Sequence, residues 1–219
     1  MQNALILALA ALTAAAPLDA PKTSTAPAQT KYEATFDDLS SLTQNVALQE
    51  VGPYDGLDYK GIDLISLGLD GTIVAGVTPR TYPNAGVYLP VSGVLDGAPS
   101  ITTQYEGSVT DTFDFEGFWF GCIGMSVEAV ASAPLSCDVT VAGFKASLEV
   151  ARQTFSFKYN VLTDLLTAPM VKAKLSNAFK GIDSATFSTE YDVTNAVGAT
   201  LLDSLRYTTY NAKDKVEKN

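Results

Sequence analysis

Residues 154–161 read TFSFKYNV, and the alternation within this stretch decides the fold class. Large apolar side chains stand at every second position from Phe155 to Val161, and polar side chains fill the positions between them. Successive side chains of a β-strand point to opposite faces, so this strand has one apolar face and one polar face. An antiparallel sheet with one face on the core and one in water produces this pattern. The stretch therefore predicts a strand of an antiparallel sheet.

Further short stretches rich in β-branched and aromatic residues follow along the chain, with Gly and Pro between them. They cover residues 59–67, 72–77, 87–92, 100–105, 110–121, 137–142, 184–190 and 201–210. Pro90 places one of them at a sheet edge or a bulge. Residues 169–179 alone suggest a short helix. Many short strands at this spacing are typical of an antiparallel β-sandwich.

The two ends of the chain differ in composition from the β-rich middle. Residues 1–16 hold an uncharged Leu- and Ala-rich run that is too short to cross a bilayer and has the pattern of a secretory signal peptide. A buried N-terminal helix or an uncleaved anchor is the alternative. Residues 17–31, rich in Pro, Ala and Thr, are expected to form a disordered spacer. We expect one β-sandwich domain over residues 32–210 and a polar tail over residues 211–219.

Charge and cysteine content limit the partners and the compartment. The chain has 24 acidic and 14 basic residues and a net charge of −10, without a basic stripe, so we expect no nucleic-acid partner. No further apolar run reaches the roughly 18–20 residues of a membrane span. Cys122 and Cys137 predict one disulfide in an oxidising compartment, with two buried thiols as the alternative. The protein is therefore expected to be secreted or to lie in the lumen of the secretory pathway.

The sequence contains no histidine, and this absence narrows the chemistry more than any motif does. Histidine is the commonest general base, the commonest metal ligand and the usual activator of a Ser or Cys nucleophile. Its absence excludes Ser-His-Asp hydrolases and zinc hydrolases. We therefore expect a protein that binds a ligand, or orients reactants, without conventional catalytic groups and without a cofactor.

Four short motifs follow one another along the chain: FDDL at residues 36–39, PYDGLDYKG at 53–61, IDSATFS at 182–188 and LDSLRY at 202–207. This order resembles a loose group of exported fungal jelly-roll proteins that are similar to galactose-binding-like carbohydrate-binding modules. The resemblance implies a jelly-roll β-sandwich over most of residues 32–210. Some exported fungal proteins of similar size and β-sandwich character are cofactor-free pericyclases, the hetero-Diels–Alderases of tropolone–sesquiterpenoid pathways. The resemblance assigns no catalytic residue.

Three aspartates form a candidate metal site. Asp37 and Asp38 lie at the start of the domain, and Asp203 lies on its last strand. The first and last strands of a jelly roll are often neighbours, and carboxylate oxygens are ligands that Ca²⁺ prefers. The resemblance also implies a structural calcium ion there. The alternative is that these acids cap turns or face water.

One aromatic segment, FDFEGFWFG, begins at Phe113 and contains the only tryptophan. Strand geometry predicts Phe113, Phe115 and Trp119 on one face, and Phe118 and Phe120 on the other. One face would fill the core, and the other would line a pocket or stack on sugar rings. The alternative is that the aromatic residues fill a core under a covering loop.

Two loops supply further candidates for ligand binding. Tyr54 and Tyr59 flank a turn at Gly56, and Arg80 and Tyr82 lie in a loop bounded by two prolines. Loops at the rim of a sandwich often carry function, and Tyr and Arg combine an apolar body with a polar end. The alternative is ordinary loop packing.

These observations leave two main functional hypotheses. The first, which the resemblance and the absence of histidine place ahead, is a cofactor-free pericyclase of fungal meroterpenoid biosynthesis, which needs an apolar cavity that orients two reacting π-systems. The second is a non-catalytic secreted protein that binds carbohydrate or cell wall, or acts as an effector. An enclosed pocket favours the first, and an exposed aromatic strip favours the second. For either ligand, small molecule or glycan, the candidate residues are Tyr54, Tyr59, Arg80, Tyr82 and Trp119.

Overall fold

The computed structural model describes residues 28–40, 49–66, 76–89, 97–125, 133–160, 167–192 and 197–212. The predicted signal peptide, most of the predicted spacer and most of the tail lie outside these residues, as does Pro90. The described part of the chain contains no helix with the length and hydropathy of a membrane-spanning segment.

The regular secondary structure of the described residues is almost entirely β-strand, as the alternation predicts. The strands are β1 (Gln29–Ala34), β2 (Gln49–Tyr54), β3 (Leu57–Ser66), β4 (Val77–Thr78), β5 (Asn84–Tyr88), β6 (Ser100–Thr102), β7 (Thr110–Met125), β8 (Ala133–Pro134), β9 (Cys137–Lys145), β10 (Leu148–Phe157), β11 (Ala168–Pro169), β12 (Val171–Lys174), β13 (Ser184–Tyr191) and β14 (Val197–Asn211). A single 3₁₀ turn, η1 (Asn177–Phe179), precedes β13. Strand β1 begins at Gln29, inside the segment expected as a spacer, and pairs with the end of β14.

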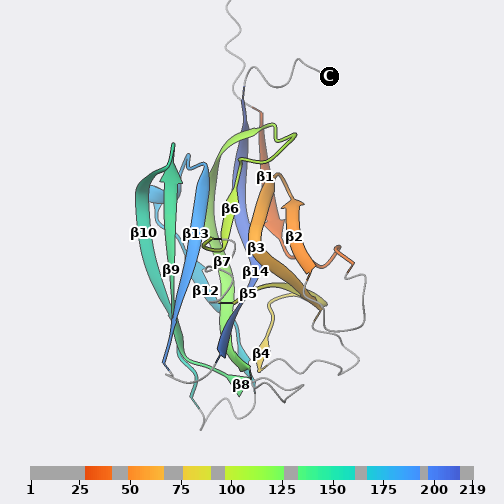
Figure 1. The fold of residues 1–219 in the computed structure, drawn as a ribbon, viewed down its shortest axis with the longest axis vertical. Coiled ribbons are helices and arrows are strands. Elements are labelled where there is room, and N and C mark those ends of the chain that lie inside the picture. Colours follow the sequence, from red (N-terminus) through yellow and green to blue (C-terminus); the bar gives the residue numbers. More distant parts are fainter. Residues whose placement is uncertain are drawn as a thin grey trace, which may run out of the picture.

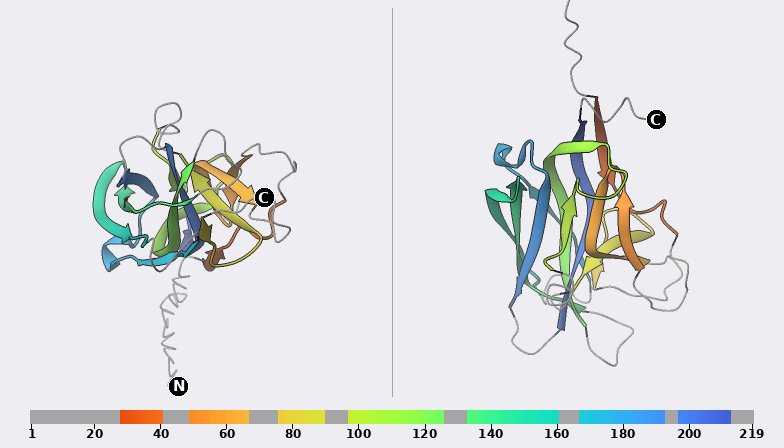
Figure 2. Two further views of the ribbon diagram at one scale, coloured as in Figure 1. Left: turned by 90° about the horizontal axis from the view of Figure 1, so that it is seen from below. Right: turned by 45° about the horizontal axis from the view of Figure 1, so that its top comes forward.

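Most strands join one curled antiparallel sheet in the order β10-β9-β13-β6-β3-β5-β14-β7-β12 (Figure 1). Strands β1, β2 and β8 pair with β14, β3 and β7 respectively, and the short β4 and β11 form a separate parallel pair. The sheet curls until its end strands approach each other, which the end-on view in Figure 2 shows. Gln153 connects end strand β10 to the other end strand, β12. Its side chain donates to the Lys174 carbonyl at 3.2 Å and accepts from the Ser176 amide at 3.1 Å. The strands that precede β3 in this order and the strands that follow it are the two halves of the sheet, which face each other as a β-sandwich.

Strand β3 carries the chain from one half of the sandwich to the other. Asp58–Lys60 pair with β6, whereas Asp63–Ser66 pair with β5. Gly61 lies between these two pairings with φ +62°, a conformation that glycine adopts without steric cost. This change of partner within one strand lets the sheet turn back over its own core.

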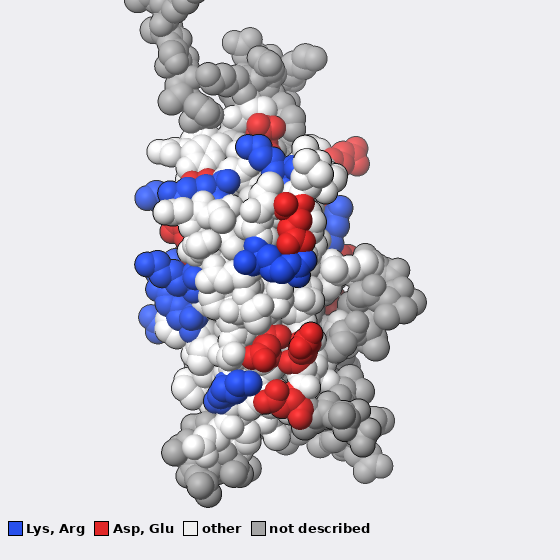
Figure 3. Space-filling model, turned by 90° about the vertical axis from the view of Figure 1, so that its left-hand side faces the viewer, with Lys and Arg blue, Asp and Glu red and all other residues white. Residues whose placement is uncertain are grey.

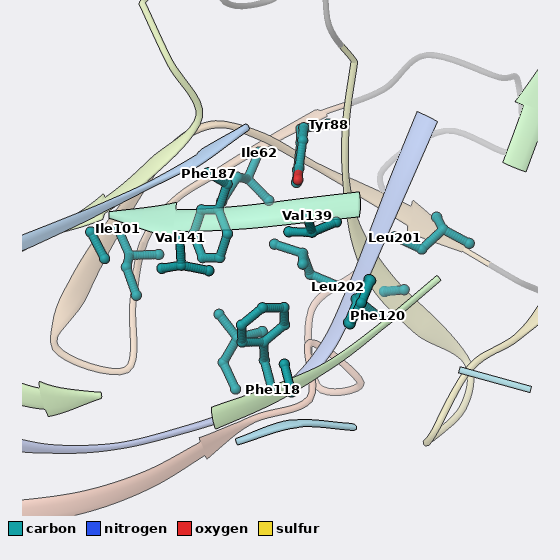
Figure 4. Packing of buried hydrophobic residues seen from close by; sticks show 14 of the residues in the cluster. Ile62, Tyr88, Ile101, Phe118, Phe120, Val139, Val141, Phe187, Leu201 and Leu202 are labelled. Carbon is teal, nitrogen blue, oxygen red and sulfur yellow. The ribbon is translucent and has the colours of Figure 1, made fainter. Parts of the chain in front are cut away.

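Phenylalanine side chains from both halves fill the core (Figure 4). Phe118 of β7 packs edge-on against Phe187 of β13 at 5.7 Å and against Phe155 of β10 at 5.9 Å between ring centroids. The predicted disulfide is confirmed: Cys122 of β7 and Cys137 of β9 are bonded across the core, with their Cα atoms 6.2 Å apart. The two halves are thus joined by aromatic packing and by one covalent bond.

The expected division of aromatic residues between the two faces of β7 is wrong. Phe113, Phe115, Phe118 and Phe120 are all buried, and only Trp119 faces outward. The pairing of β7 with β14 shifts register twice around Gly117, and each shift inserts one extra residue into one of the strands. An extra residue reverses which face the following side chains occupy. A Cβ at Gly117 would lie 2.4 Å from the Ala173 carbonyl oxygen, so only glycine fits at this point.

The expected helix over residues 169–179 is also wrong. The segment forms the end of β11, then β12 and the single turn η1. Val171, Ala173 and Leu175 alternate with exposed lysines, and Ala173 and Leu175 are buried. This is the period of two that belongs to a strand, and the free edge of β7 offers it a pairing partner.

Candidate functional site

The predicted ligand-binding residues separate into two groups. Tyr54 and Tyr59 belong to a cluster of aromatic residues around the β2–β3 turn. Arg80 meets Trp119 on the outer face of β7, and Tyr82 lies in the same loop as Arg80. The two groups differ in what they leave available to a ligand.

Tyr59 is a core residue and is not available to a ligand, contrary to the prediction. Its side chain is completely buried, and its hydroxyl lies 3.0 Å from that of Tyr207. The Tyr207 hydroxyl donates to the Asp55 carbonyl at 3.1 Å. Burial raises the pKa of both phenols, so both stay neutral and the chain of hydrogen bonds is structural.

Tyr54 is half-buried and fixed at both ends. Its ring stacks on Phe36 with 5.7 Å between centroids, and its hydroxyl donates to Asp38 Oδ1 at 2.7 Å. Burial, followed by the hydrogen bond to Asp38, raises the pKa of Tyr54. The phenol therefore acts as a neutral donor to a carboxylate of its own chain.

Asp37 and Asn84 connect the FDDL turn to the start of β5. Asp37 Oδ1 accepts from the Asn84 amide at 3.0 Å. The Asn84 side chain returns two hydrogen bonds, to the carbonyls of Phe36 at 2.9 Å and Leu39 at 2.7 Å. Asp37 therefore caps a turn, which is one of the two readings that the sequence leaves open.

Asp203 of β14 holds the loop over residues 79–83 through hydrogen bonds from Thr81. Its carboxylate is fully buried and accepts from the Thr81 amide at 2.8 Å, the Thr81 hydroxyl at 3.1 Å and the Ser204 hydroxyl at 3.1 Å. Burial raises the pKa of Asp203, and these hydrogen bonds oppose the shift.

The three aspartates therefore do not form a calcium site in this structure. Asp37, Asp38 and Asp203 each accept hydrogen bonds from a neighbouring turn or side chain. Among the described residues, no group of three or more acidic or cysteine side chains is close enough to hold a metal ion. Hydrogen bonds within the chain therefore account for all three carboxylates.

Arg80 and Trp119 form a cation–π pair on the outer face. The guanidinium carbon of Arg80 lies 5.2 Å from the centre of the Trp119 ring. Trp119 is therefore covered on this face by a residue of its own chain. Tyr82 is the exposed member of the group, with 45% of its surface accessible.

The FDDL, PYDGLDYKG and LDSLRY motifs meet in one junction. Phe36 of the first motif packs edge-on against Tyr59 of the second at 5.5 Å, and Tyr59 contacts Tyr207 of the third. Asp203 of the third motif accepts from Thr81 in the loop over residues 79–83. Asn84, which follows this loop, donates to the Phe36 carbonyl of the first motif. These motifs thus carry the packing of the fold.

An open concave surface lies elsewhere, over β1, β14, β7 and β12. We call it the β7–β14 groove: it is open, has a volume of about 490 Å³, and is lined by Lys31, Asp114, Glu116, Lys174, Leu175, Ser176, Asn177, Lys180, Thr208 and Tyr210, with Gln29 and Phe115. The walls of this groove come from segments far apart in the chain, so no local pattern in the sequence points to it.

Hydrogen bonds hold the floor of the β7–β14 groove in place. Asp114 accepts from the Gly181 amide at 2.8 Å and from the Tyr210 hydroxyl at 3.1 Å. Glu116 accepts from the Thr208 hydroxyl at 3.3 Å. Burial, then the hydrogen bond to Asp114, raises the pKa of Tyr210. The acidic groups of the groove are therefore already engaged with neighbouring donors.

A second open groove, of about 570 Å³, lies beside the β2–β3 hairpin. Its charged residues are Glu50, Asp58, Lys60 and Asp63. Burial raises the pKa of Asp58, and Lys60, at 3.8 Å, opposes this shift. On the face drawn in Figure 3, basic and acidic side chains are interspersed.

Comparison with known proteins supports the fold alone. No family model and no curated protein sequence matches the chain. The solved structure of a DUF4465 family protein from Bacteroides caccae is similar, with a TM-score of 0.52 at 11% sequence identity. The similarity covers 84% of this chain and 100% of that chain.

Proposed function

We propose that this protein is a non-catalytic carbohydrate-binding β-sandwich whose ligand lies in the β7–β14 groove. The single observation that carries the proposal is the groove itself, which is open, about 490 Å³ in volume and lined mainly by polar side chains. Its walls offer amide, hydroxyl, carboxylate and ammonium groups, the donors and acceptors that sugar hydroxyls require. Tyr210 adds an aromatic ring with a polar end.

The architecture supports binding by a rigid surface. The floor of the groove consists of paired strands β7 and β14, and its acidic groups are fixed by hydrogen bonds. A site on a rigid scaffold loses little conformational entropy when the ligand binds. The disulfide is typical of proteins in oxidising compartments, which is consistent with an exported protein.

The hetero-Diels–Alderase hypothesis stays a prediction, as does the resemblance to exported fungal jelly-roll proteins. A pericyclase needs an apolar cavity that excludes water around the reacting π-systems. Both grooves described above are open and polar, and neither is lined by Tyr54, Tyr59, Arg80, Tyr82 or Trp119. We therefore place the binding function first.

A glycan array followed by calorimetric titration of any bound oligosaccharide tests the proposal. Tyr210→Ala is expected to weaken binding by about tenfold, because it removes the ring of the groove. Tyr82→Ala is the matched control, since it removes an exposed tyrosine outside the groove. Loss of binding in Tyr82→Ala but not in Tyr210→Ala would move the site to the loop over residues 79–83. An array without any bound glycan would contradict the proposal.

A further inference from the structure

We infer that the β7–β14 groove takes an acidic glycan, whose carboxylates are bound by Lys31, Lys174 and Lys180; this inference rests on the proposed function. The three lysines line one groove in a chain whose net charge is −10. Within the part of the chain that the structure describes, none of the three has a carboxylate within 4.0 Å of its ammonium group. Lys60 and Lys158, outside this groove, do have such partners.

The two acids of the groove do not satisfy these lysines. Asp114 is held by the Gly181 amide and the Tyr210 hydroxyl, and Glu116 is held by Thr208. Their negative charges lower the positive potential of the groove, but their hydrogen bonds go to neutral donors. The ammonium groups are therefore left facing solvent, where an anionic ligand gains a charge-assisted hydrogen bond from each.

The position of the lysines favours a chain of anionic units over a single compact anion. Lys31 lies on β1 and Lys174 on β12, and strands β14 and β7 separate them in the sheet. Three strand spacings amount to roughly 14 Å across the floor of the groove. A single carboxylate reaches one wall, whereas an oligosaccharide with a carboxylate on each unit reaches both. An oligomer of uronic acid has this chemistry.

Calorimetric titration with an oligogalacturonate and with its carboxyl-reduced, neutral form tests the inference on the whole protein. We expect the acidic form to bind at least tenfold more tightly and to lose affinity as the salt concentration rises. The triple variant Lys31→Gln/Lys174→Gln/Lys180→Gln is expected to lose at least tenfold in affinity for the acidic form.

The control variant is Lys60→Gln/Arg152→Gln/Lys158→Gln, which makes the same change in charge at exposed positions outside the groove. Its affinity should stay within twofold of wild type. Circular dichroism checks that both triple variants fold, and the single variants Lys31→Gln and Lys180→Gln, at exposed positions, serve if the groove variant does not.

Three outcomes would overturn the inference. Equal affinity for the acidic and neutral forms would leave the proposed function standing and remove the role of the lysines. Equal affinity for a single-stranded DNA oligomer of the same charge would show an unselective electrostatic surface. Failure of both forms, together with an empty glycan array, would remove the proposed function as well.

Discussion

Replacing Asp203 with alanine is expected to destabilise the fold by about 2–3 kcal/mol. The buried carboxylate accepts hydrogen bonds from the amide and hydroxyl of Thr81 and from the hydroxyl of Ser204. A hydrogen bond to a charged group contributes about 1.5–3 kcal/mol, and a buried amide left without an acceptor costs about 1–3 kcal/mol. The variant no longer buries a charge, and this gain offsets part of the loss.

Asp203→Asn is the matched control, because it keeps the shape of the side chain and one oxygen that accepts from the Thr81 amide. Its stability should lie within about 1 kcal/mol of wild type. Burial raises the folded-state pKa of Asp203, so the folded state binds this proton more tightly than the unfolded state does. The stability of wild type relative to Asp203→Asn should therefore be highest at low pH and fall as pH rises above the unfolded pKa of about 3.9.

Urea denaturation followed by fluorescence of Trp119, the only tryptophan and the register partner of Asp203, measures these differences. In thermal unfolding, a loss of 2–3 kcal/mol corresponds to a decrease in Tm of about 5–10 °C for a domain of this size. A stability of Asp203→Ala within about 0.5 kcal/mol of wild type would refute the role of Asp203 as a buried anchor. A calcium-dependent Tm in wild type that is absent from Asp203→Asn would instead assign the carboxylate to a cation site.

Three further changes test other parts of the structure. Cys122→Ser/Cys137→Ser should lower stability by about 3 kcal/mol in urea denaturation, as expected for a loop of 15 residues, and an unchanged midpoint would contradict the role of the bond between the two halves. Gly117→Ala should cost about 1–3 kcal/mol, because its Cβ would meet a backbone carbonyl of β12 at 2.4 Å; equal stability in the same assay would argue against the tight contact. Arg80→Ala should shift the emission of Trp119 to longer wavelength while changing stability by less than about 1 kcal/mol, and an unshifted spectrum would mean that the cation–π pair does not shield the ring in solution.

Local patterns were sufficient to predict the class of the fold. The predicted alternation is present in β10: Phe155 is half-buried and Phe157 is buried, and the residues on either side of Phe155 are exposed. Cys122 and Cys137 form the predicted bond. Both predictions depend on properties that a segment or a pair of residues carries by itself: the period of a strand, and the pairing of two cysteines in an oxidising compartment.

The same reasoning failed where one extra residue changed the outcome. Strict alternation predicts Phe118 on the face opposite Phe115, but the two rings stack at 5.8 Å. The bulges around Gly117 belong to the pairing of β7 with β14, and no local pattern in β7 specifies them. Residues 169–179 were predicted as a helix because the edge of β7, with which β12 pairs, is distant in sequence.

The candidate site was also beyond local patterns. Tyr59 and Trp119 were predicted as ligand-binding residues, yet Tyr59 is in the core and Trp119 is covered by Arg80. Lys31 and Lys180 were not predicted as site residues, because a lysine outside any motif does not indicate a binding site. They line one groove only because β1, β14, β7 and β12 lie side by side.

The sequence alone therefore determined that the chain forms an antiparallel β-structure with one disulfide, and that no histidine takes part in its chemistry. Strand period and residue type are local properties, which the chain expresses wherever the strand is placed. Only the tertiary structure decided which aromatic residues are buried, which aspartates cap turns and which lysines share a groove. These outcomes depend on register between strands separated by up to about 180 residues, as for Gln29 and Tyr210, and register is set by packing of the whole sheet.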